Sequence, residues 1–355
     1  MSGGFRDVIK VASVYMATII GAGFASGQEI VQFFTAYEKG GFYGILLAGI
    51  LFSVIGCLVL DKVYRGRIRD YNEFIYPLLG LKTGRFVEAA ATVFMFCLFC
   101  IMIAGAGNIL YQKLGFSFLV SVIIMGLLCM FFMSGSIKGI AALSTAVTPV
   151  LIIGILATGL YVVIFRDIST FNIAVFLKGM RYNWFASAIL YVGYNSIMSI
   201  MLMSGMLAYL KSEKTARLGG LIGGMMLCFA ALILYAALFL NNSSRSEAEL
   251  PFLQLVSRYD VLMGILYSGL LWLAMFLSAA TSGYCFVDRV CGRTHISRFA
   301  ITAIVCFAAV PLSTVGFSKL IAYIYPVFGY LGLFISIAVI LQGISEGFRR
   351  KQSSK

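Results

Sequence analysis

Glu29 is a carboxylate set within a largely apolar stretch, after the string Gly-Ala-Gly-Phe-Ala-Ser-Gly at 21–27 and Gln28. A carboxylate in such surroundings can neutralise the ammonium group of a solute, carry a coupling proton, or form half of a gate. The alternative is that Glu29 reaches a watery vestibule or pairs with a loop cation such as Lys39. Glu29 is therefore the first candidate for a binding residue, with these roles open.

Three hydroxyl residues form a second candidate group. Ser278, Thr281 and Ser282 stand at i, i+3 and i+4, a spacing that places them on one face of a helix. Three oxygens on one face can converge on a cation. Serine and threonine also often bond back to the carbonyls of their own helix, and this is the competing interpretation.

The glycine-rich string before Glu29 predicts an interruption in the helix that positions this carboxylate. A helix that unwinds between Gly21 and Gly27 leaves N–H groups at the start of one half, and carbonyls at the end of the other, without partners. The N–H groups attract a carboxylate and the carbonyls attract a cation. Close packing of helices through Gly23 and Gly27 is the alternative.

Composition places these residues in a membrane. Hydrophobic residues make up 61% of the 355 residues and charged residues 12%, in long apolar blocks separated by short charged patches. Continuous apolar blocks predict helices, because the strands of a membrane barrel would alternate polar and apolar residues. We therefore expect an all-α polytopic membrane protein with one transmembrane domain over residues 1–355.

The net charge of +13 indicates an orientation in the bilayer and gives no support to nucleic-acid binding. Most lysines and arginines fall in loops that share one side of the membrane if the N-terminus is cytoplasmic, including the basic loop between Asp61 and Arg85. The positive-inside rule then predicts that both termini are cytoplasmic, in the inner (plasma) membrane of the cell.

Ten spans fit the apolar blocks, and they divide into two sets of five over residues 8–165 and 182–345. Five crossings per half invert the second half relative to the first, which makes an inverted-topology repeat. Each half opens with a predicted mid-membrane break, at Gly21–Gly27 in the first span and at Tyr191–Ser196 in the sixth. The spans are expected near 8–37, 40–61, 86–111, 116–133, 138–165, 182–209, 216–241, 260–286, 297–315 and 318–345.

This arrangement, five plus five spans with interrupted first and sixth helices, resembles the amino acid-polyamine-organocation superfamily and its leucine-transporter fold. The string GAGFASGQE at Gly21–Glu29 resembles the YkvI-like family of bacterial membrane proteins, and GAG followed by a bulky residue is shared loosely with branched-chain amino acid carriers. The resemblance implies a sodium site between first-span carbonyls and eighth-span oxygens. Its ligands would be the carbonyls of Ala17, Ile20 and Ser278 and the hydroxyls of Thr281 and Ser282. Oxygens without a carboxylate suit a monovalent cation.

A substrate pocket is expected between the two breaks and the third and eighth spans. Interhelical hydrogen bonding is the alternative role for the two asparagines in this group. The resemblance also implies that the 242–259 loop acts as a lid, and a solvated connector is the alternative. The candidate substrate-binding residues are Gly21, Ala22, Gly23, Ala25, Ser26, Gly27, Glu29, Asn108, Tyr191, Tyr194 and Asn195.

Together these features predict a secondary transporter, coupled to a cation with sodium favoured, that carries a small organic solute through the lipid bilayer by alternating access. We expect the solute to be an amino acid or a related amine, and no cofactor. A proton-coupled carrier or exchanger that uses Glu29 is the alternative, and a channel is a further one. An enzyme is not expected, because His295 is the only histidine and no HExxH, GxSxG or phosphate-loop motif occurs. The oligomeric state stays open.

Overall fold

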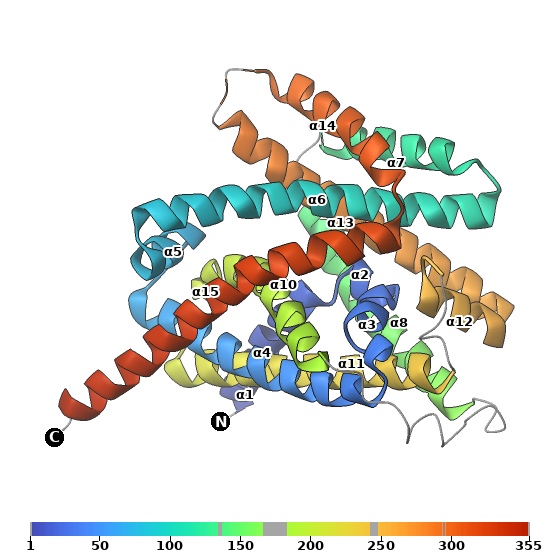
Figure 1. The fold of residues 1–355 in the computed structure, drawn as a ribbon. Helices are drawn as coiled ribbons and strands as arrows, with labels where there is room; N and C mark the ends of the chain where they lie inside the picture. The colour runs from blue at the N-terminus through green and yellow to red at the C-terminus, as the bar shows by residue number, and fades with distance from the viewer. Residues whose placement is uncertain are drawn as a thin grey trace.

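The computed structural model describes residues 2–133, 137–165, 183–241, 248–292, 294 and 296–353, and its regular elements in these ranges are all helices. Several long helices run in the same general direction across Figure 1, with α15 crossing them obliquely. In chain order the helices are α1 (Ser2–Ile19), α2 (Ala22–Ala25), α3 (Gln28–Phe33), η1 (Thr35–Tyr37), α4 (Lys39–Gly66), α5 (Tyr71–Leu79), α6 (Leu81–Leu114), α7 (Phe118–Met133), α8 (Ile137–Ile164), α10 (Trp184–Ser204), η3 (Leu207–Tyr209), α11 (Glu213–Leu240), α12 (Pro251–Tyr259), α13 (Val261–Cys291), α14 (Arg298–Ser313) and α15 (Phe317–Ser353).

Length and hydropathy identify seven of the described helices as candidate membrane spans: α4, α6, α8, α10, α11, α13 and α15. A helix needs about 20 apolar residues to cross the hydrocarbon core, and all seven approach or exceed this length. The helices α7 and α14 are apolar but shorter, with 16 residues each. The chain is therefore a multi-pass helical membrane protein.

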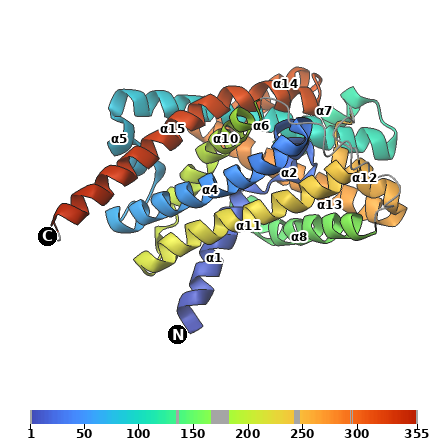
Figure 2. The ribbon, with the colours of Figure 1, turned by 60° about the horizontal axis from the view of Figure 1, so that its bottom comes forward.

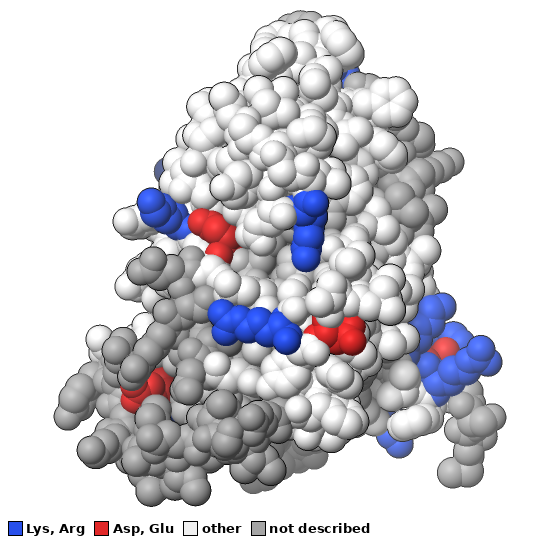
Figure 3. All heavy atoms as spheres, turned by 90° about the vertical axis from the view of Figure 1, so that its right-hand side faces the viewer, with Lys and Arg blue, Asp and Glu red and all other residues white. Residues whose placement is uncertain are grey.

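The sides of the helical bundle are apolar where lipid would meet them. Phe131, Phe229 and Leu266 are each more than half exposed, an arrangement that water would penalise and lipid would not. Figure 3 faces the side of the molecule on which α12 lies in Figure 1, and its charged residues stand singly or in small groups among uncharged ones. A bilayer therefore accounts for the exposed apolar side chains.

A cluster of ion pairs joins the end of α4 to the start of α11. Asp61 accepts from Arg65 and from Arg217, both at 3.0 Å, and Glu213 pairs with Arg217 at 3.0 Å and also with Arg65. Exposed pairs of this kind each contribute about 0–1 kcal/mol. The cluster therefore adds little stability. It marks the charged end of α4 and the charged start of α11.

Glycines bring α4 and α11 into close contact. A side chain at Gly220 would overlap the backbone of Gly56, so only glycine permits this approach. Tyr15 of α1 adds a buried hydrogen bond from its hydroxyl to the Phe52 carbonyl of α4, at 2.9 Å. Figures 1 and 2 both show α4 and α11 side by side, and Figure 2 shows α1 crossing them at an angle. These helices form one packed group beside the interrupted α1–α3 segment.

The predicted break at Tyr191–Ser196 is wrong, because α10 is one continuous helix from Trp184 to Ser204. The polar side chains there support the helix: Asn195 donates to the Tyr191 carbonyl at 3.0 Å, and Ser196 donates to the Val192 carbonyl at 2.7 Å. Gly193 faces the backbone of α15 at Gly329 and has no room for a side chain. Gly193 allows α10 and α15 to pack closely, whereas the sequence predicted unwinding at this position.

Candidate functional site

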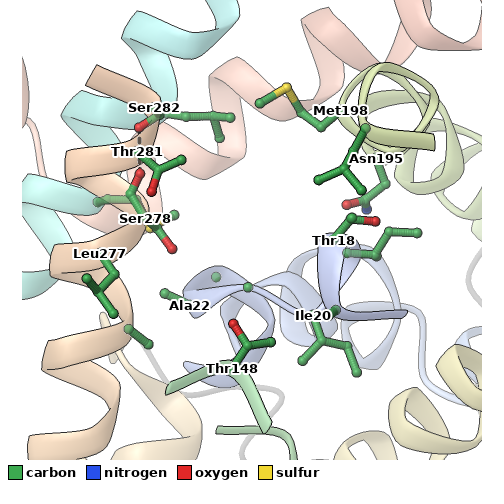
Figure 4. A pocket seen from close by; sticks show the side chains of 18 of the residues that line it. Thr18, Ile20, Ala22, Thr148, Asn195, Met198, Leu277, Ser278, Thr281 and Ser282 are labelled. Carbon is green, nitrogen blue, oxygen red and sulfur yellow. Dashed lines mark hydrogen bonds between the residues drawn. The ribbon is translucent and has the colours of Figure 1, made fainter. Parts of the chain in front are cut away.

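A cavity of about 420 Å³ lies beside the interruption between α1 and α2. Eight helices contribute to its walls: α1, α2, α3, α6, α8, α10, α13 and α15, together with the α1–α2 junction. Its volume falls within the range of about 300–1,000 Å³ that is typical of pockets for small organic molecules. Figure 4 shows residues of α13 on one side of it and residues of α1 and α10 on the other.

The interruption leaves backbone groups of the first apolar stretch without helical partners. The helix α1 ends at Ile19, and the Gly21 amide donates to the Ile19 carbonyl at 2.9 Å in place of the Ala17 carbonyl one turn back. Among the described residues, the carbonyls of Ala17 and Ile20 accept no hydrogen bond. Both residues line the cavity, so two carbonyls are available at its wall.

Glu29 reaches the same cavity from the first turn of α3. Its side chain is only 5% exposed, and one carboxylate oxygen, Oε2, accepts a hydrogen bond of 2.7 Å from the hydroxyl of Tyr194. Its other oxygen, Oε1, lies against Gly23, where any side chain would collide with it. No cation in the described part of the chain pairs with this carboxylate, Lys39 included.

Aromatic rings surround this carboxylate. The rings of Tyr194 and Tyr325 lie 4.3 Å apart between centroids with their planes tilted by 33°, and Phe33 is 5.5 Å from Tyr194. Phe94 contacts Tyr325 edge-on from α6. Tyr194, Tyr325 and Phe94 all line the cavity. Glu29 therefore faces the cavity among aromatic groups.

The predicted hydroxyl group of α13 lies on the cavity wall opposite the α1–α2 junction, as Figure 4 shows. Ser282 donates back to the Ser278 carbonyl at 2.7 Å and to the Ala279 carbonyl at 3.2 Å, so the alternative of bonding within the helix describes this serine correctly. The side chains of Thr281 and Ser278 make no hydrogen bond with any described residue. Two hydroxyls are therefore free to bind a ligand.

The structure divides the predicted site residues into two sets. Eleven of them line the cavity, and five do not. The five outside are Ala25, Ser26, Gly27, Asn108 and Tyr191. The cavity brings together Ala17, Ile20, Gly21, Ala22, Gly23, Glu29, Tyr194, Asn195, Ser278, Thr281 and Ser282.

The end of α2 contacts α12 and α13 in place of the cavity. The Ala25 carbonyl accepts from the Tyr267 hydroxyl at 2.7 Å, and the Ser26 carbonyl accepts from the Phe252 amide at 2.9 Å. Gly27 adopts a φ of +80°, which favours glycine, and a side chain there would approach Phe252 Cβ to 2.7 Å. Ser26 and Gly27 therefore contact the segment that was expected to act as a lid, and Ala25 is bonded to α13.

Asn108 and Tyr191 have structural partners elsewhere. Gln112 donates to the Asn108 side chain at 2.5 Å within α6, which is neither of the roles expected for this asparagine. Tyr191 packs edge-on against Phe34, with a centroid distance of 4.8 Å, and is 2% exposed. Its ring belongs to an aromatic cluster beside the cavity.

Several cavity residues were not predicted from the sequence. Met95 and Met102 of α6 and Met198 and Met201 of α10 line the walls, as does Thr148 of α8. No sequence signal distinguishes a methionine that lines a cavity from one in the core, since both are apolar residues within an apolar span. Tyr325 of α15 lines the cavity as well.

The charge of the cavity wall is concentrated at one residue. Among the lining residues that the structure describes, Glu29 is the only lysine, arginine, histidine, aspartate or glutamate. In the described part of the chain, no group of three His, Cys, Asp or Glu side chains is placed to hold a metal ion. His295 lies outside the described residues, as do residues 166–182 and 242–247.

Sequence comparison identifies relatives along almost the whole chain, although no protein-family profile matches it. The chain is 29% identical over 327 residues to the "Uncharacterized membrane protein YkvI" of Bacillus subtilis (strain 168), covering 91% of this chain and 92% of that one. It is 26% identical over 341 residues to the "Uncharacterized protein YyaD" of the same strain, covering 96% and 98%. Both matches span nearly the full length of either partner.

Comparison of folds finds secondary transporters. MhsT, solved in complex with L-phenylalanine, matches with a TM-score of 0.65 and 16% identity, over 93% of this chain and 87% of that one. A Na+-coupled sialic acid symporter matches with a TM-score of 0.59 and 14% identity, over 94% and 78%. The manganese transporter of Eremococcus coleocola gives 0.58 and 14%, over 93% and 77%. The chain is thus a multi-pass membrane protein with the fold of leucine-transporter-type carriers, similar in sequence to YkvI and YyaD.

Proposed function

We propose that the chain is a secondary transporter that couples the movement of a small organic solute, an amino acid or related amine, to a cation, with sodium favoured. One observation carries this proposal: all five predicted cation ligands line the same cavity as Glu29 and the interrupted helix. They come from α1 with its junction to α2 and from α13, far apart in the chain, so their presence around one cavity is a property of the fold and not of local sequence.

The available oxygens suit sodium. The carbonyls of Ala17 and Ile20 and the hydroxyl of Thr281 have no other partner in the described part of the chain. Ser282 uses its hydrogen to bond the Ser278 carbonyl, which leaves oxygen lone pairs for a cation. Neutral oxygens favour a monovalent ion, whereas calcium and magnesium recruit carboxylates. A manganese cargo has less support because Glu29 is the only carboxylate in the cavity wall.

We propose ten crossings in two inverted sets of five. The interrupted α1–α3 segment, the seven long helices and the two shorter ones, α7 and α14, supply them. The ion pairs at the end of α4 and the start of α11 fit a cytoplasmic position for this end, and both termini would then be cytoplasmic. For alternating access, α1, α4, α10 and α11, which pack on one another, would move against the remaining helices.

A proton-coupled exchanger is the second candidate, and the environment of Glu29 favours it. A buried carboxylate without a cationic partner is neutralised most simply by a proton or by a cationic ligand. A channel has less support, because the Phe252 amide of α12 bonds to the Ser26 carbonyl at the end of α2, next to the interruption. Flux that saturates and exchanges one for one would indicate a carrier, and ohmic currents would indicate a channel.

The testing experiment measures the thermal stabilisation of the purified protein by a panel of amino acids and amines, in sodium and in potassium at equal ionic strength. A solute whose stabilisation requires sodium supports sodium coupling. Stabilisation that ignores sodium but follows pH supports the proton-coupled alternative. If no solute stabilises the protein under any of these conditions, the proposed solute class is wrong.

Two variants locate the cation. Thr281→Val removes a hydroxyl that has no described partner, and Ser282→Ala removes one that is bonded to its own helix. We expect Thr281→Val to raise the sodium concentration for half-maximal stabilisation by roughly 10-fold or more, as loss of a polar contact to a charge implies. An unchanged sodium dependence in both variants would remove the site from α13.

A further inference from the structure

The cavity wall, where it is described, carries a negative charge and no positive one. Among the described residues, Glu29 supplies its only formal charge, and no described lysine, arginine or histidine lines the cavity to pair with a carboxylate on a solute. An amino acid bound here would find a counter-ion for its ammonium group but no side-chain counter-ion for its carboxylate. A solute that carries only the ammonium group would lose nothing by this arrangement.

The carboxylate is built into its position. Tyr194 bonds one oxygen, Oε2, at 2.7 Å, and Gly23 makes room for the other, Oε1. A carboxylate can accept about four hydrogen bonds, and Oε1 accepts none from the described residues. Oε1 is not fully enclosed by protein atoms, so it remains accessible from the cavity. Oε1 can therefore accept hydrogen bonds from a solute in the cavity.

The surroundings of Glu29 suit an organic cation. Tyr194, Tyr325 and Phe94 present aromatic rings to the same cavity, and such rings attract ammonium groups through their electron-rich faces. Beyond them the wall is apolar, with methionines such as Met95 and Met198 that adapt to ligands of varied shape. The carboxylate, the rings and the apolar wall together define an ammonium head group and an apolar body.

We infer that the solute of this cavity is an organic amine with an apolar body, bound as the ammonium ion against Glu29 and with no need for a carboxylate. This inference rests on the proposed transport function and narrows the proposed solutes from amino acids and related amines to amines alone. An ammonium ion and a proton compete for the same carboxylate, so amine binding weakens as the pH falls. The titratable groups that face Glu29 are Tyr191 and Tyr194 of α10 and Tyr325 of α15, and in the described part of the chain α2, η1, α11 and α12 bring no charged side chain to it.

The test compares matched solutes on the purified full-length protein. One set is 2-phenylethylamine, L-phenylalanine and 3-phenylpropionate, and the other is isoamylamine, L-leucine and 4-methylpentanoate. We expect each amine to bind at least as tightly as its amino acid, and the two acids to give no binding. Amine affinity should fall as the pH is lowered, by at most about tenfold per pH unit for competition with one proton.

Variants assign the binding to Glu29. Glu29→Gln should weaken amine binding by roughly 30-fold or more, in the range seen when one partner of a buried charge pair is lost. Glu213→Gln makes the same change in the exposed ion-pair cluster and should leave amine binding as in the wild type. A carbodiimide that labels carboxyl groups in apolar sites gives a second measurement on the wild-type protein. 2-Phenylethylamine should protect Glu29 from labelling, and 3-phenylpropionate should not.

The outcomes separate the inference from the function on which it rests. If an amino acid binds and its amine binds about tenfold more weakly or worse, the solute carboxylate is required. The inference is then overturned, and the proposed transporter stands. If Glu29→Gln binds the amine as the wild type does, or amine fails to protect Glu29, Glu29 is not the counter-ion and the inference is also overturned. If neither amines nor amino acids bind in sodium or in potassium, both proposals fall.

Discussion

Gly23→Ala tests the position of the Glu29 carboxylate with a single methyl group. A Cβ built on Gly23 would collide with Glu29 Oε1 and would also lie 3.2 Å from the carboxylate carbon and 3.4 Å from the Tyr325 hydroxyl oxygen. These distances leave no space for the carboxylate in its present place. Either Glu29 swings away from Tyr194, or α2 shifts as a unit.

The two responses have different magnitudes. A swing of the carboxylate breaks its 2.7 Å bond to Tyr194, and a hydrogen bond to a charged group contributes about 1.5–3 kcal/mol. That loss corresponds to a decrease in the affinity for a cationic ligand of about 10- to 150-fold. A shift of α2 instead strains its packing, and overpacking of a core typically costs about 1–3 kcal/mol of folding stability.

Calorimetric titration of an amine and the melting temperature measured without ligand distinguish these responses. Gly269→Ala is the matched control, because it makes the same change in α13 at a position with no atom within 4 Å of the new methyl group. We expect the control to bind as the wild type and to melt at the same or a slightly higher temperature. If Gly23→Ala keeps both the wild-type affinity and the wild-type melting temperature, Glu29 does not lie against Gly23 and the described geometry is wrong.

Three further substitutions test the contacts around the site through the melting temperature of the purified protein. Gly27→Ala should destabilise by at least about 1–2 kcal/mol, because φ is +80° and the methyl would press on the Cβ and the amide nitrogen of Phe252; an unchanged melting temperature would contradict this geometry. Tyr267→Phe should cost about 1–3 kcal/mol by leaving the buried Ala25 carbonyl unpaired, and an unchanged melting temperature would contradict the 2.7 Å bond. Gly193→Ala should be the most damaging, since its methyl meets the backbone of α15, and a tolerated alanine would reopen the possibility of unwinding in α10.

The position of the hydroxyl group on α13 could be predicted because it depends on helix periodicity alone. Residues at i, i+3 and i+4 share a face wherever the helix lies, and Ser278, Thr281 and Ser282 all line the cavity. The interruption near Gly21 was also readable, since several small residues occur together with a carboxylate in an apolar span. In both cases a local rule sufficed.

The behaviour of Gly193 could not be predicted by such a rule. Glycine between tyrosine, asparagine and serine is compatible with unwinding and with close helix packing, and the choice depends on what the neighbouring helix presents. Here α15 presents Gly329, whose backbone occupies the space beside Gly193. That partner is more than 130 residues away in the chain. The methionines of the cavity wall could not be predicted for a related reason, since only the fold decides which apolar residues border a cavity.

The small-residue string at 21–27 makes space for the Glu29 carboxylate and also contacts α12, and Ser26 connects these two roles. Its hydroxyl donates to the Gly23 carbonyl at 2.7 Å, and its own carbonyl accepts from the Phe252 amide of α12 at 2.9 Å. Gly23 in turn makes the space that Glu29 occupies. If α12 moves away from the interruption, it must break the bond to Ser26 or draw α2 with it, and a displaced α2 alters the place of the carboxylate. The position of α12 and the position of the Glu29 carboxylate are therefore linked through a single helical turn.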